Sequence, residues 1–409
     1  MEGSEQEADS IKIGYIFISL GPIETSVSKK VTGQIKFLNG LEGVECTGLF
    51  FSCFYEKNED EGFIKQIQVP KSDKKYFNHL RQNELNYKII LEFLQTHKNE
   101  YTHFYLRHNS SSKNLWKIVQ LKLNLTIEIN GNLPATIPKD KKKLTSVSDF
   151  LHNLAFYYLP LRNERVYGTK IFNHCRISST SGELYQLFKS FYQIKKDRFF
   201  VVGNGINLES IPVREFSKTN EVFKMLILKG AEIKADYLGL DRVLNGLAQY
   251  DGSEGQVELV CAGKHFDDEK VLVKNLGIES RVKFVGYLDR NQMGQIVSEC
   301  DIAISSLATY RSGIKEISSL KTREYFGRGI PFLYGYDDTD LMKIPESHDF
   351  ALKVSNESSP VDIKNVISFF GKIVESPDHP EKMREIAEKY LAMDKKMLNL
   401  AEELRKPYV

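Results

Sequence analysis

Two glutamates, Glu316 and Glu324, stand with seven residues between them in the stretch 307–332, which reads LATYRSGIKEISSLKTREYFGRGIPF. A carboxylate can accept two hydrogen bonds from neighbouring hydroxyl groups, so this pair suits a hydroxyl-rich ligand such as a sugar or a ribose. The alternative is an exposed charged loop that leads into an ordinary amphipathic helix, and for an isolated pair this alternative is the commoner one. The surrounding elements must therefore decide between the two interpretations.

The elements around the pair are predicted to bring it to the edge of a sheet. The apolar run at 300–306 predicts a short buried strand, and residues 322–328 predict a helix that ends before Gly329. Glu316 then falls in a loop at the carboxyl end of the strand, and Glu324 falls in the first turns of the helix. Ligands of open α/β sheets bind at this edge, where helix amino-termini meet.

Cationic residues lie close to the glutamates in the sequence. Arg311, Lys321 and Arg323 can hold a diphosphate through charge-assisted hydrogen bonds. A short acidic pattern, Asp338 with Asp340, matches a metal-binding arrangement, but three-residue acidic patterns often arise by chance. We therefore expect no metal at that position.

Composition limits the class of protein. The chain has 409 residues, a net charge of +2 and 41% hydrophobic residues, which favours two α/β domains and gives no argument for a nucleic-acid partner. No apolar run is long enough to span a membrane, and the polar residues 1–10 are expected to be disordered. Five scattered cysteines without metal-ligand spacing indicate buried thiols in a reducing cytoplasm.

Strands and helices alternate along the whole chain. In the first half, strands are predicted at 11–20, 44–54, 103–107 and 125–129, and residues 21–28 are predicted to form a strand-to-helix loop with free backbone amides. In the second half, strands at 224–229, 257–261 and 282–288 alternate with helices, and a single helix is predicted at 382–404. This alternation predicts doubly wound parallel sheets.

These motifs are similar to those of retaining GT-B glycosyltransferases, especially family four and its bacterial branch that builds surface polysaccharides. The resemblance is densest over 201–332, including the turn NGIN and the run SLKTREYFGRGIPF. It implies an α/β GT-B fold with two Rossmann-like doubly wound domains that face a central cleft. The implied parts are an acceptor-side domain at 11–206, a nucleotide-sugar-binding domain at 207–381, and a terminal helix at 382–409 that packs back toward the first domain.

The resemblance also implies roles for individual residues. Glu316 and Asn130 would position the transferred sugar, Glu324 the ribose, and Arg311 and Lys321 the phosphates. Further residues implied at the donor are Lys229, Lys234, Gly21, Thr25, Ser26, Gly263, Gly286, Tyr287, Ser319, Leu320 and Thr322.

The chain departs from the family pattern at two places. Asn130 stands where relatives often have a histidine beside the sugar. Relatives also carry cationic residues early in the second domain that hold the diphosphate, and here either Lys229 or Lys234 could take that place. This keeps open a non-catalytic GT-B subunit that binds an acceptor and assists a partner transferase. A sugar-nucleotide epimerase of the same fold needs a histidine in the cleft, and no histidine is recognisable there in the sequence.

The expected activity is retaining transfer of a sugar from a nucleotide-sugar, with a UDP-sugar expected, to a glycan or lipid-linked acceptor. No cofactor is expected to be obligatory, because the resemblance implies that cationic side chains and helix ends neutralise the diphosphate. The basic loop 138–144 and the aromatic stretch 150–161 also suit an anionic lipid-linked acceptor or peripheral contact with the inner face of the membrane. Solvated lysines are the commoner explanation of such a basic loop.

Overall fold

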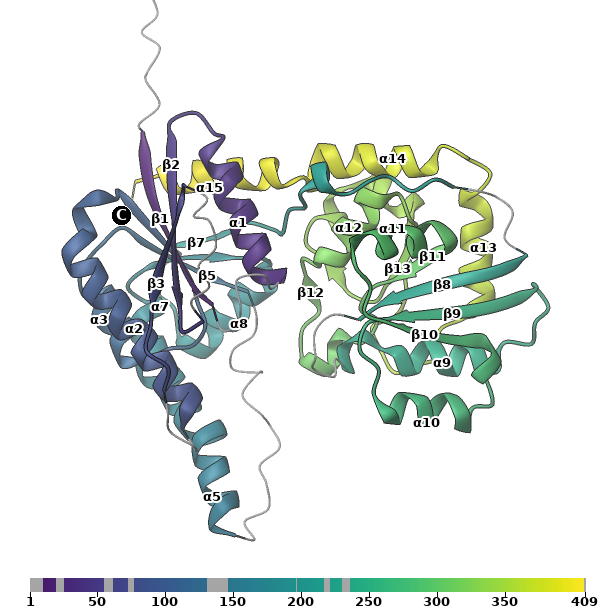
Figure 1. Cartoon of the computed structure of the whole chain (residues 1–409), viewed down its shortest axis with the longest axis horizontal. Coiled ribbons are helices and arrows are strands. Elements are labelled where there is room, and N and C mark those ends of the chain that lie inside the picture. The colour runs from purple at the N-terminus through teal and green to yellow at the C-terminus, as the bar shows by residue number, and fades with distance from the viewer. Residues whose placement is uncertain are drawn as a thin grey trace, which may run out of the picture. The chain divides into compact units, whose positions relative to one another are not determined.

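The computed structural model describes residues 10–19, 26–54, 62–72, 77–130, 146–195, 197–216, 221–229 and 236–407. The chain forms two compact α/β units (Figure 1). The first unit contains the chain up to Gly203 together with the segment from Lys396 onward, and the second contains Asn204–Lys395. The predicted disordered segment lies almost wholly outside the described residues.

The first unit is built on a parallel sheet with the strand order β3-β2-β1-β4-β5-β6-β7. Its strands are β1 (Ile11–Ser19), β2 (Val44–Ser52), β3 (Ile64–Gln68), β4 (His103–Arg107), β5 (Leu125–Ile129), β6 (Arg176–Ser179) and β7 (Phe199–Val201). Nearly every residue of β1 is buried, as expected for a parallel strand that is covered on both faces. The four strands predicted for this half are present as β1, β2, β4 and β5.

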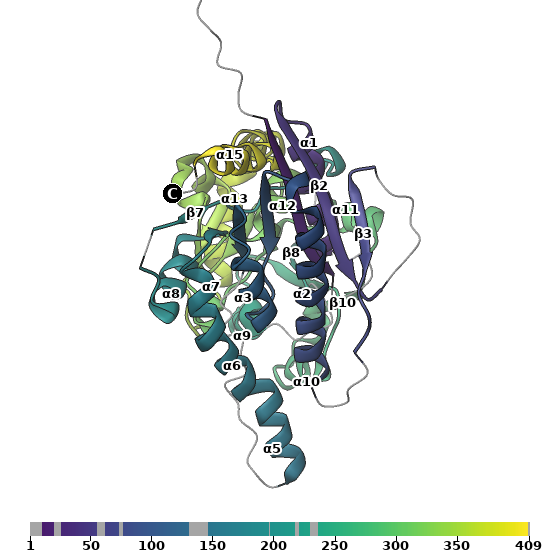
Figure 2. The ribbon, with the colours of Figure 1, turned by 90° about the vertical axis from the view of Figure 1, so that its left-hand side faces the viewer.

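Helices connect these strands. They are α1 (Ser26–Asn39), α2 (Asn78–His97), α3 (Lys113–Val119), α5 (Val147–Asn153), α6 (Leu159–Asn163), α7 (Thr169–Phe172), α8 (Gly182–Tyr192) and α15 (Met393–Arg405). Two single-turn π-helical segments, Leu154–Tyr158 and Glu164–Gly168, join α5, α6 and α7 into one arm. Figure 2 shows this arm running past the sheet, with α5 at its far end.

The second unit is a parallel sheet with the strand order β10-β9-β8-β11-β13-β15. Its strands are β8 (Val222–Leu228), β9 (Gln256–Ala262), β10 (Val282–Gly286), β11 (Ile302–Ile304), β13 (Phe332–Tyr334) and β15 (Ala351–Lys353), and a separate pair is β12 (Glu316–Ile317) with β14 (Asp337–Asp338). Its helices are α9 (Leu240–Gln249), α10 (Asp267–Asn275), α11 (Arg290–Glu299), α12 (Leu320–Arg328), α13 (Ile363–Ile373) and α14 (His379–Ile386). The predicted strands at 224–229, 257–261, 282–288 and 300–306 are present as β8, β9, β10 and β11.

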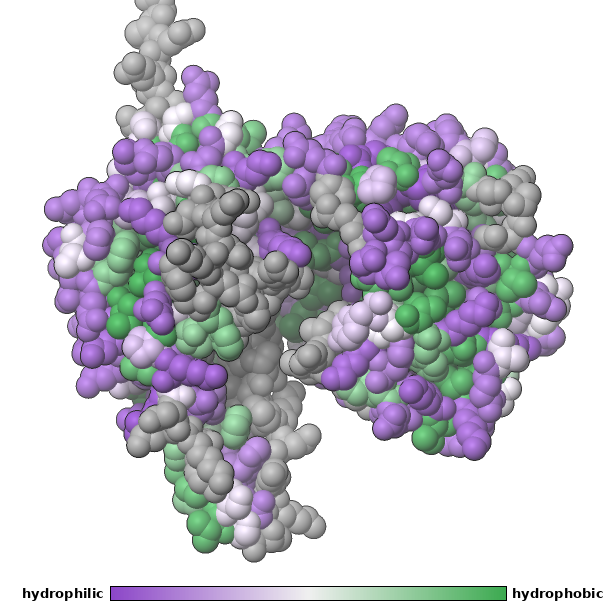
Figure 3. All heavy atoms as spheres, in the orientation of Figure 1, coloured by the Kyte–Doolittle hydropathy of each residue, from purple (hydrophilic) through white to green (hydrophobic). Residues whose placement is uncertain are grey.

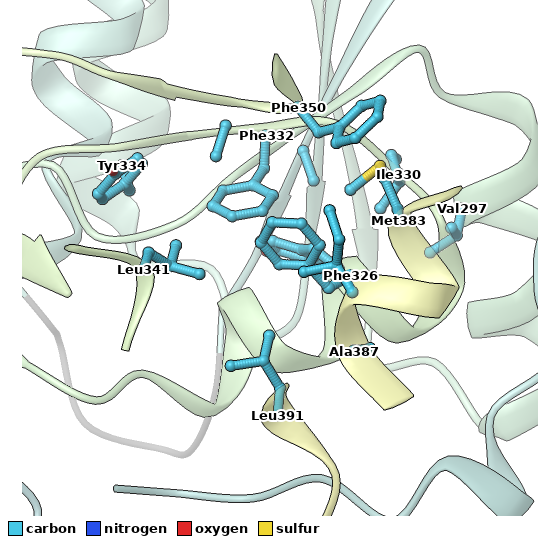
Figure 4. Packing of buried hydrophobic residues seen from close by; sticks show 14 of the residues in the cluster. Val297, Phe326, Ile330, Phe332, Tyr334, Leu341, Phe350, Met383, Ala387 and Leu391 are labelled. Carbon is cyan, nitrogen blue, oxygen red and sulfur yellow. The ribbon is translucent and has the colours of Figure 1, made fainter. Parts of the chain in front are cut away.

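The core of the second unit fixes α12 against the sheet. Phe326 on α12 packs edge to face on Phe332 of β13, with ring centres 5.3 Å apart, and Met383 and Leu391 close the cluster from the other side (Figure 4). The helix ends at Gly329, which adopts the left-handed conformation, as the sequence predicted. This packing fixes the carboxyl-terminal half of α12 against the sheet.

The prediction of one helix at 382–404 is wrong. The chain turns from α14 into a π-helical segment, Ala387–Leu391, and then becomes extended at Ala392 before α15 begins. The reason is a backbone pairing, because Ile206 donates to Leu391 and accepts from Met393. Ala392 alone gives no sequence signal for such a break.

Within the described ranges, no helix combines the length and apolar character needed to cross a bilayer. All five cysteines are free thiols, and only Cys53 is partly exposed.

Candidate functional site

The segment from β12 to α12 carries both glutamates of the sequence motif. Glu316 is the first residue of β12 and is half-buried, and α12 begins four residues later, after Ser319. The first backbone N–H groups of a helix have no partner within the helix, so this end is suited to an anion. Glu324 follows in the second turn of α12. The motif therefore places a carboxylate on each side of an amide-rich helix end.

Lys321 lies in the first turn of α12 and is half-buried. Burial, helped by the charge of Lys229 and partly offset by the carboxylate of Glu324, lowers the pKa of its ammonium to about 8. These electrostatic effects show that Lys321, Glu324 and Lys229 lie close together. Lys321 is thus a cation whose charge is poorly compensated by the protein.

Lys229 follows β8 and is buried beneath the same edge of the sheet. Its ammonium forms an ion pair with Glu269 on α10 and lies 5.1 Å from the ring centre of Phe266. This ion pair neutralises most of the positive charge of Lys229, a residue that was expected from the sequence to bind the diphosphate.

Two glycines bring backbone close together beside Lys229. Gly263, after β9, has φ +107°, and a Cβ atom there would overlap the carbonyl oxygen of Lys229. Its amide donates to the carbonyl of Gly286 at 2.6 Å, and Gly286 is itself left-handed, with φ +73°. Gly263 therefore leaves no room for a side chain, whereas at Gly286 only the positive φ favours glycine.

His265 lies at this edge, although the sequence analysis recognised no histidine there. The amide of Gly286 donates to His265 Nε2 at 3.0 Å, so the ring accepts through Nε2 and its Nδ1 carries the proton. Nδ1 is buried without a partner among the described residues, and burial lowers the pKa of the ring.

Arg311 is positioned by Asp241 of α9. Its guanidinium donates two bonds of 2.8 Å to that carboxylate and a third, of 3.0 Å, to the carbonyl of Asp236. Most of its donors are therefore occupied, and its charge is offset.

The expectation that Arg323 could hold a diphosphate is wrong. Its side chain is fully buried, and it forms ion pairs with Asp338 and Asp340. The hydroxyl of Thr322 is buried in the same cluster, where it donates to Asp338 at 3.1 Å. Of the polar groups of Thr322, only the backbone amide can therefore bind a ligand. The acidic pattern of Asp338 and Asp340 is explained by its ion pairs with Arg323.

Glu324 keeps one carboxylate oxygen in a pair with Arg328, whose Nε donates to Oε1 at 2.9 Å. Leu320 at the start of α12 is 39% exposed, and Tyr287 after β10 is 64% exposed. Both can be reached by a ligand, and Tyr287 packs against little of the protein.

Asn130 belongs to the first unit, directly after β5. It lies beside Glu128, which is buried, accepts from the Tyr15 hydroxyl at 3.1 Å and pairs with Arg107 at 3.3 Å. Burial alone would raise the pKa of Glu128, but the charges of Arg107 and Lys30 outweigh it and lower that pKa. Lys30 is half-buried and has a pKa lowered to about 8 by burial.

Several predicted donor residues cannot be located. Gly21, Thr25 and Lys234 lie outside the described residues, and Ser26 is placed only as the first residue of α1.

No known protein-family model matches the sequence, and no curated protein matches it. Solved structures do match. A glycosyltransferase from Rickettsia africae ESF-5 is 15% identical over 98% of this chain and 100% of its own, with a TM-score of 0.64. Sucrose-phosphate synthase from Thermosynechococcus elongatus is 14% identical over 97% of this chain and 98% of its own, with a TM-score of 0.66.

A third match is Alr3699/HepE from Anabaena, in complex with UDP and glucose. It is 15% identical over 97% of this chain and 100% of its own, with a TM-score of 0.59. At these identities the likeness establishes the architecture, which the two parallel sheets also show. The chain therefore has the GT-B fold, built from two Rossmann-like α/β units.

Proposed function

We propose that this chain is a retaining glycosyltransferase, which moves a sugar from a nucleotide-sugar to a glycan or lipid-linked saccharide, as in bacterial surface polysaccharide synthesis. The observation that carries this proposal is the β12–α12 segment, where Glu316, a helix amino-terminus and Glu324 follow one another. A UDP-sugar is the proposed donor, because the structurally similar HepE was crystallised with UDP and glucose.

Each polar group of this segment has a role in the proposal. Glu324 accepts hydrogen bonds from the ribose hydroxyls through Oε2, since Arg328 occupies Oε1. Lys321 and the first amides of α12 neutralise the diphosphate. Glu316 holds hydroxyls of the transferred sugar.

The proposed chemistry is mainly electrostatic. Cleavage of the bond to the sugar leaves negative charge on the diphosphate and positive charge on the anomeric carbon, and fixed charges stabilise both. We propose no obligatory metal, because Lys321 and the helix end supply the positive charge. Asp338 and Asp340 are already engaged by Arg323.

A non-catalytic GT-B subunit is the second candidate. It is favoured by one observation, that both Lys229 and Arg311 are neutralised by carboxylates, which weakens the attraction for a diphosphate. Such a subunit would bind an acceptor and assist a partner transferase, and it would not need to bind nucleotide.

We also propose that the enzyme works at the inner face of the cytoplasmic membrane. Val147, Phe150 and Tyr158 on the α5 arm are 75%, 52% and 46% exposed, and Figure 3 shows hydrophobic residues gathered at the end of this arm. Apolar groups of this kind can enter the lipid headgroup region. Flotation with anionic vesicles tests this, and loss of binding in Phe150→Ser is expected. Equal flotation of Phe150→Ser and the wild type would count against contact through the arm.

The two candidates are separated by nucleotide binding. Thermal unfolding is followed with UDP, GDP and ADP and with their glucose conjugates. A ligand at 100 times its Kd adds about 2.7 kcal/mol of stability, which is a readily measured shift. Stabilisation by one nucleotide series supports the transferase, whereas no response to any of them supports the non-catalytic subunit.

A further inference from the structure

A cavity of about 530 Å³ lies within the second unit, at the carboxyl end of α12. Its wall combines the segment 212–215, one face of α11 and Arg328, the last residue of α12. This volume is in the range of small-molecule sites, which is about 300 to 1,000 Å³. At a rise of about 1.5 Å per residue α12 is about 12 Å long, so the cavity lies at the other end of this helix from the amides proposed for the diphosphate.

Arg214 in this wall is a buried cation without a carboxylate partner. A guanidinium has five N–H donors. Here Nη1 donates to the carbonyl of Cys300 at 2.7 Å, and Nη2 donates to His379 Nε2 at 2.9 Å. The Nε is buried and has no partner in the described part of the chain. Asp301 acts on Arg214 electrostatically, but no carboxylate of the described residues forms an ion pair with it.

The partners of Arg214 leave its charge uncompensated at pH 7. His379 is neutral, because burial and the charge of Arg214 lower its pKa to about 4, and its Nδ1 donates to the carbonyl of Ser376 at 3.0 Å. Burial lowers the pKa of Arg214 to about 10, which still leaves it protonated. A buried cation is costly unless an anion compensates it, so the wall favours an anionic ligand.

Arg328 brings a second guanidinium to the same wall. Its Nε donates to Glu324 at 2.9 Å. Its two terminal nitrogens have no hydrogen-bond partner among the described residues, and they are not among the side-chain atoms that are shut off from water. The backbone amide of Arg214 donates to the carbonyl of Arg328 at 2.9 Å, which fixes the two chain segments side by side. Guanidinium groups match the oxygen atoms of a phosphate group.

The helix α11 provides the uncharged part of the wall. Asn291, Gln295 and Ser298 recur at helical spacing and line the cavity, and their amide and hydroxyl groups suit the hydroxyls of a polyol. The described wall contains no aromatic ring on which a nucleobase could stack. Its one carboxylate, Glu215, is exposed to solvent, where its charge is screened.

We propose that this cavity binds the phosphate monoester of a small polyol, such as a sugar phosphate. The phosphate dianion contacts the terminal nitrogens of Arg328 and compensates the charge of Arg214 beside it. The hydroxyl groups of the ligand bind Asn291 and Gln295 on α11. This site is separate from the proposed donor site, and the proposal does not depend on glycosyl transfer.

Gly294 allows the cavity to be closed while both arginines are kept. It lies on the same face of α11, and a Cβ atom there would meet no atom within 4 Å. Gly294→Leu therefore fills part of the cavity, and leucine also favours a helix more than glycine does. Gly371→Leu is the matched control, because Gly371 is an exposed residue of α13 outside the wall and has the same free space.

Calorimetric titration with ribose 5-phosphate and glycerol 3-phosphate, at constant ionic strength, measures the binding. Ribose, citrate and vesicles of phosphatidic acid are titrated beside them, and a parallel series contains UDP to occupy the donor site. Both esters should bind the wild type and Gly371→Leu equally, with or without UDP. Gly294→Leu should bind them at least about tenfold more weakly. Cooperative thermal unfolding shows that both variants fold.

Several results would overturn the proposal. They are no binding of either ester to the wild type, equal affinity of Gly294→Leu and the wild type, and tighter binding of ribose or citrate than of the esters. Binding to the vesicles alone would replace the soluble ester with a lipid headgroup. Binding of the esters that disappears when UDP is present would assign them to the donor site instead of this cavity.

Discussion

Lys321 should make nucleotide affinity depend on pH. Burial and the charge of Lys229 together lower its pKa from 10.5 to about 8, against the opposing charge of Glu324, so the free protein loses this positive charge as the pH rises through about 8. A bound diphosphate would restore the ordinary pKa of the ammonium, and binding would therefore take up a proton above pH 8. If the restoration is complete, UDP affinity should fall about eightfold between pH 7.5 and pH 9, which is about 1.2 kcal/mol.

Calorimetric titration of UDP at several pH values measures this effect. Lys321→Arg is the matched control, because a guanidinium stays charged over the whole range and its affinity profile should be flat. Proton uptake on binding, obtained by repeating the titration in buffers of different ionisation enthalpy, should appear at pH 8.5 in the wild type and vanish in Lys321→Arg. A wild-type affinity independent of pH, or identical profiles for the two proteins, would refute the assignment of Lys321 to the diphosphate.

The remaining predictions concern three residues. Glu324→Gln should weaken UDP binding by about 1 to 3 kcal/mol in the same titration, since an amide has one acceptor oxygen; unchanged affinity would remove the ribose assignment. Gly263→Ala should lower stability to urea by about 2 to 4 kcal/mol, because its φ is positive and Lys229 blocks a Cβ atom; a neutral effect would contradict this packing. His108 is buried, and neither of its ring nitrogens has a hydrogen-bond partner in the part of the chain that the structure describes. Burial lowers its pKa to about 3 from 6.5, so stability should fall as pH drops below 6.5. This loss is about 2 kcal/mol between pH 7.5 and pH 5 in urea unfolding and should be absent in His108→Leu; equal pH dependence would show that other groups cause it.

The fold was largely predictable because apolar runs mark most of its long strands. β1, β2, β8 and β9 are covered on both faces, and their sequences show it directly. The helical arm from α5 to α7 was not predicted, since its π-helical turns interrupt the apolar spacing. The break at Ala392 was also missed, because it depends on a backbone pairing with Ile206, about 190 residues away in the sequence.

The position of the candidate site could be predicted from the sequence, but the pairing of its charged side chains could be predicted only in part. The spacing of Glu316 and Glu324 predicted a helix amino-terminus between them, and α12 begins there. Sequence alone could not show which cations are neutralised, because the partners are distant. Arg323 and Asp338 are near in sequence, but Lys229 pairs with Glu269, forty residues later, and Arg311 with Asp241, seventy residues earlier.

Release of nucleoside diphosphate from a nucleotide-sugar, by the wild type and by Glu316→Ala, tests the central claim most directly. Glu316 is proposed to contact the transferred sugar. Because this contact is proposed to strengthen as the bond to the sugar breaks, it stabilises the transition state more than the bound substrate. The account predicts that Glu316→Ala loses turnover by at least about 100-fold while its affinity for UDP stays within about twofold of the wild type. Wild-type turnover in a folded Glu316→Ala protein would contradict it.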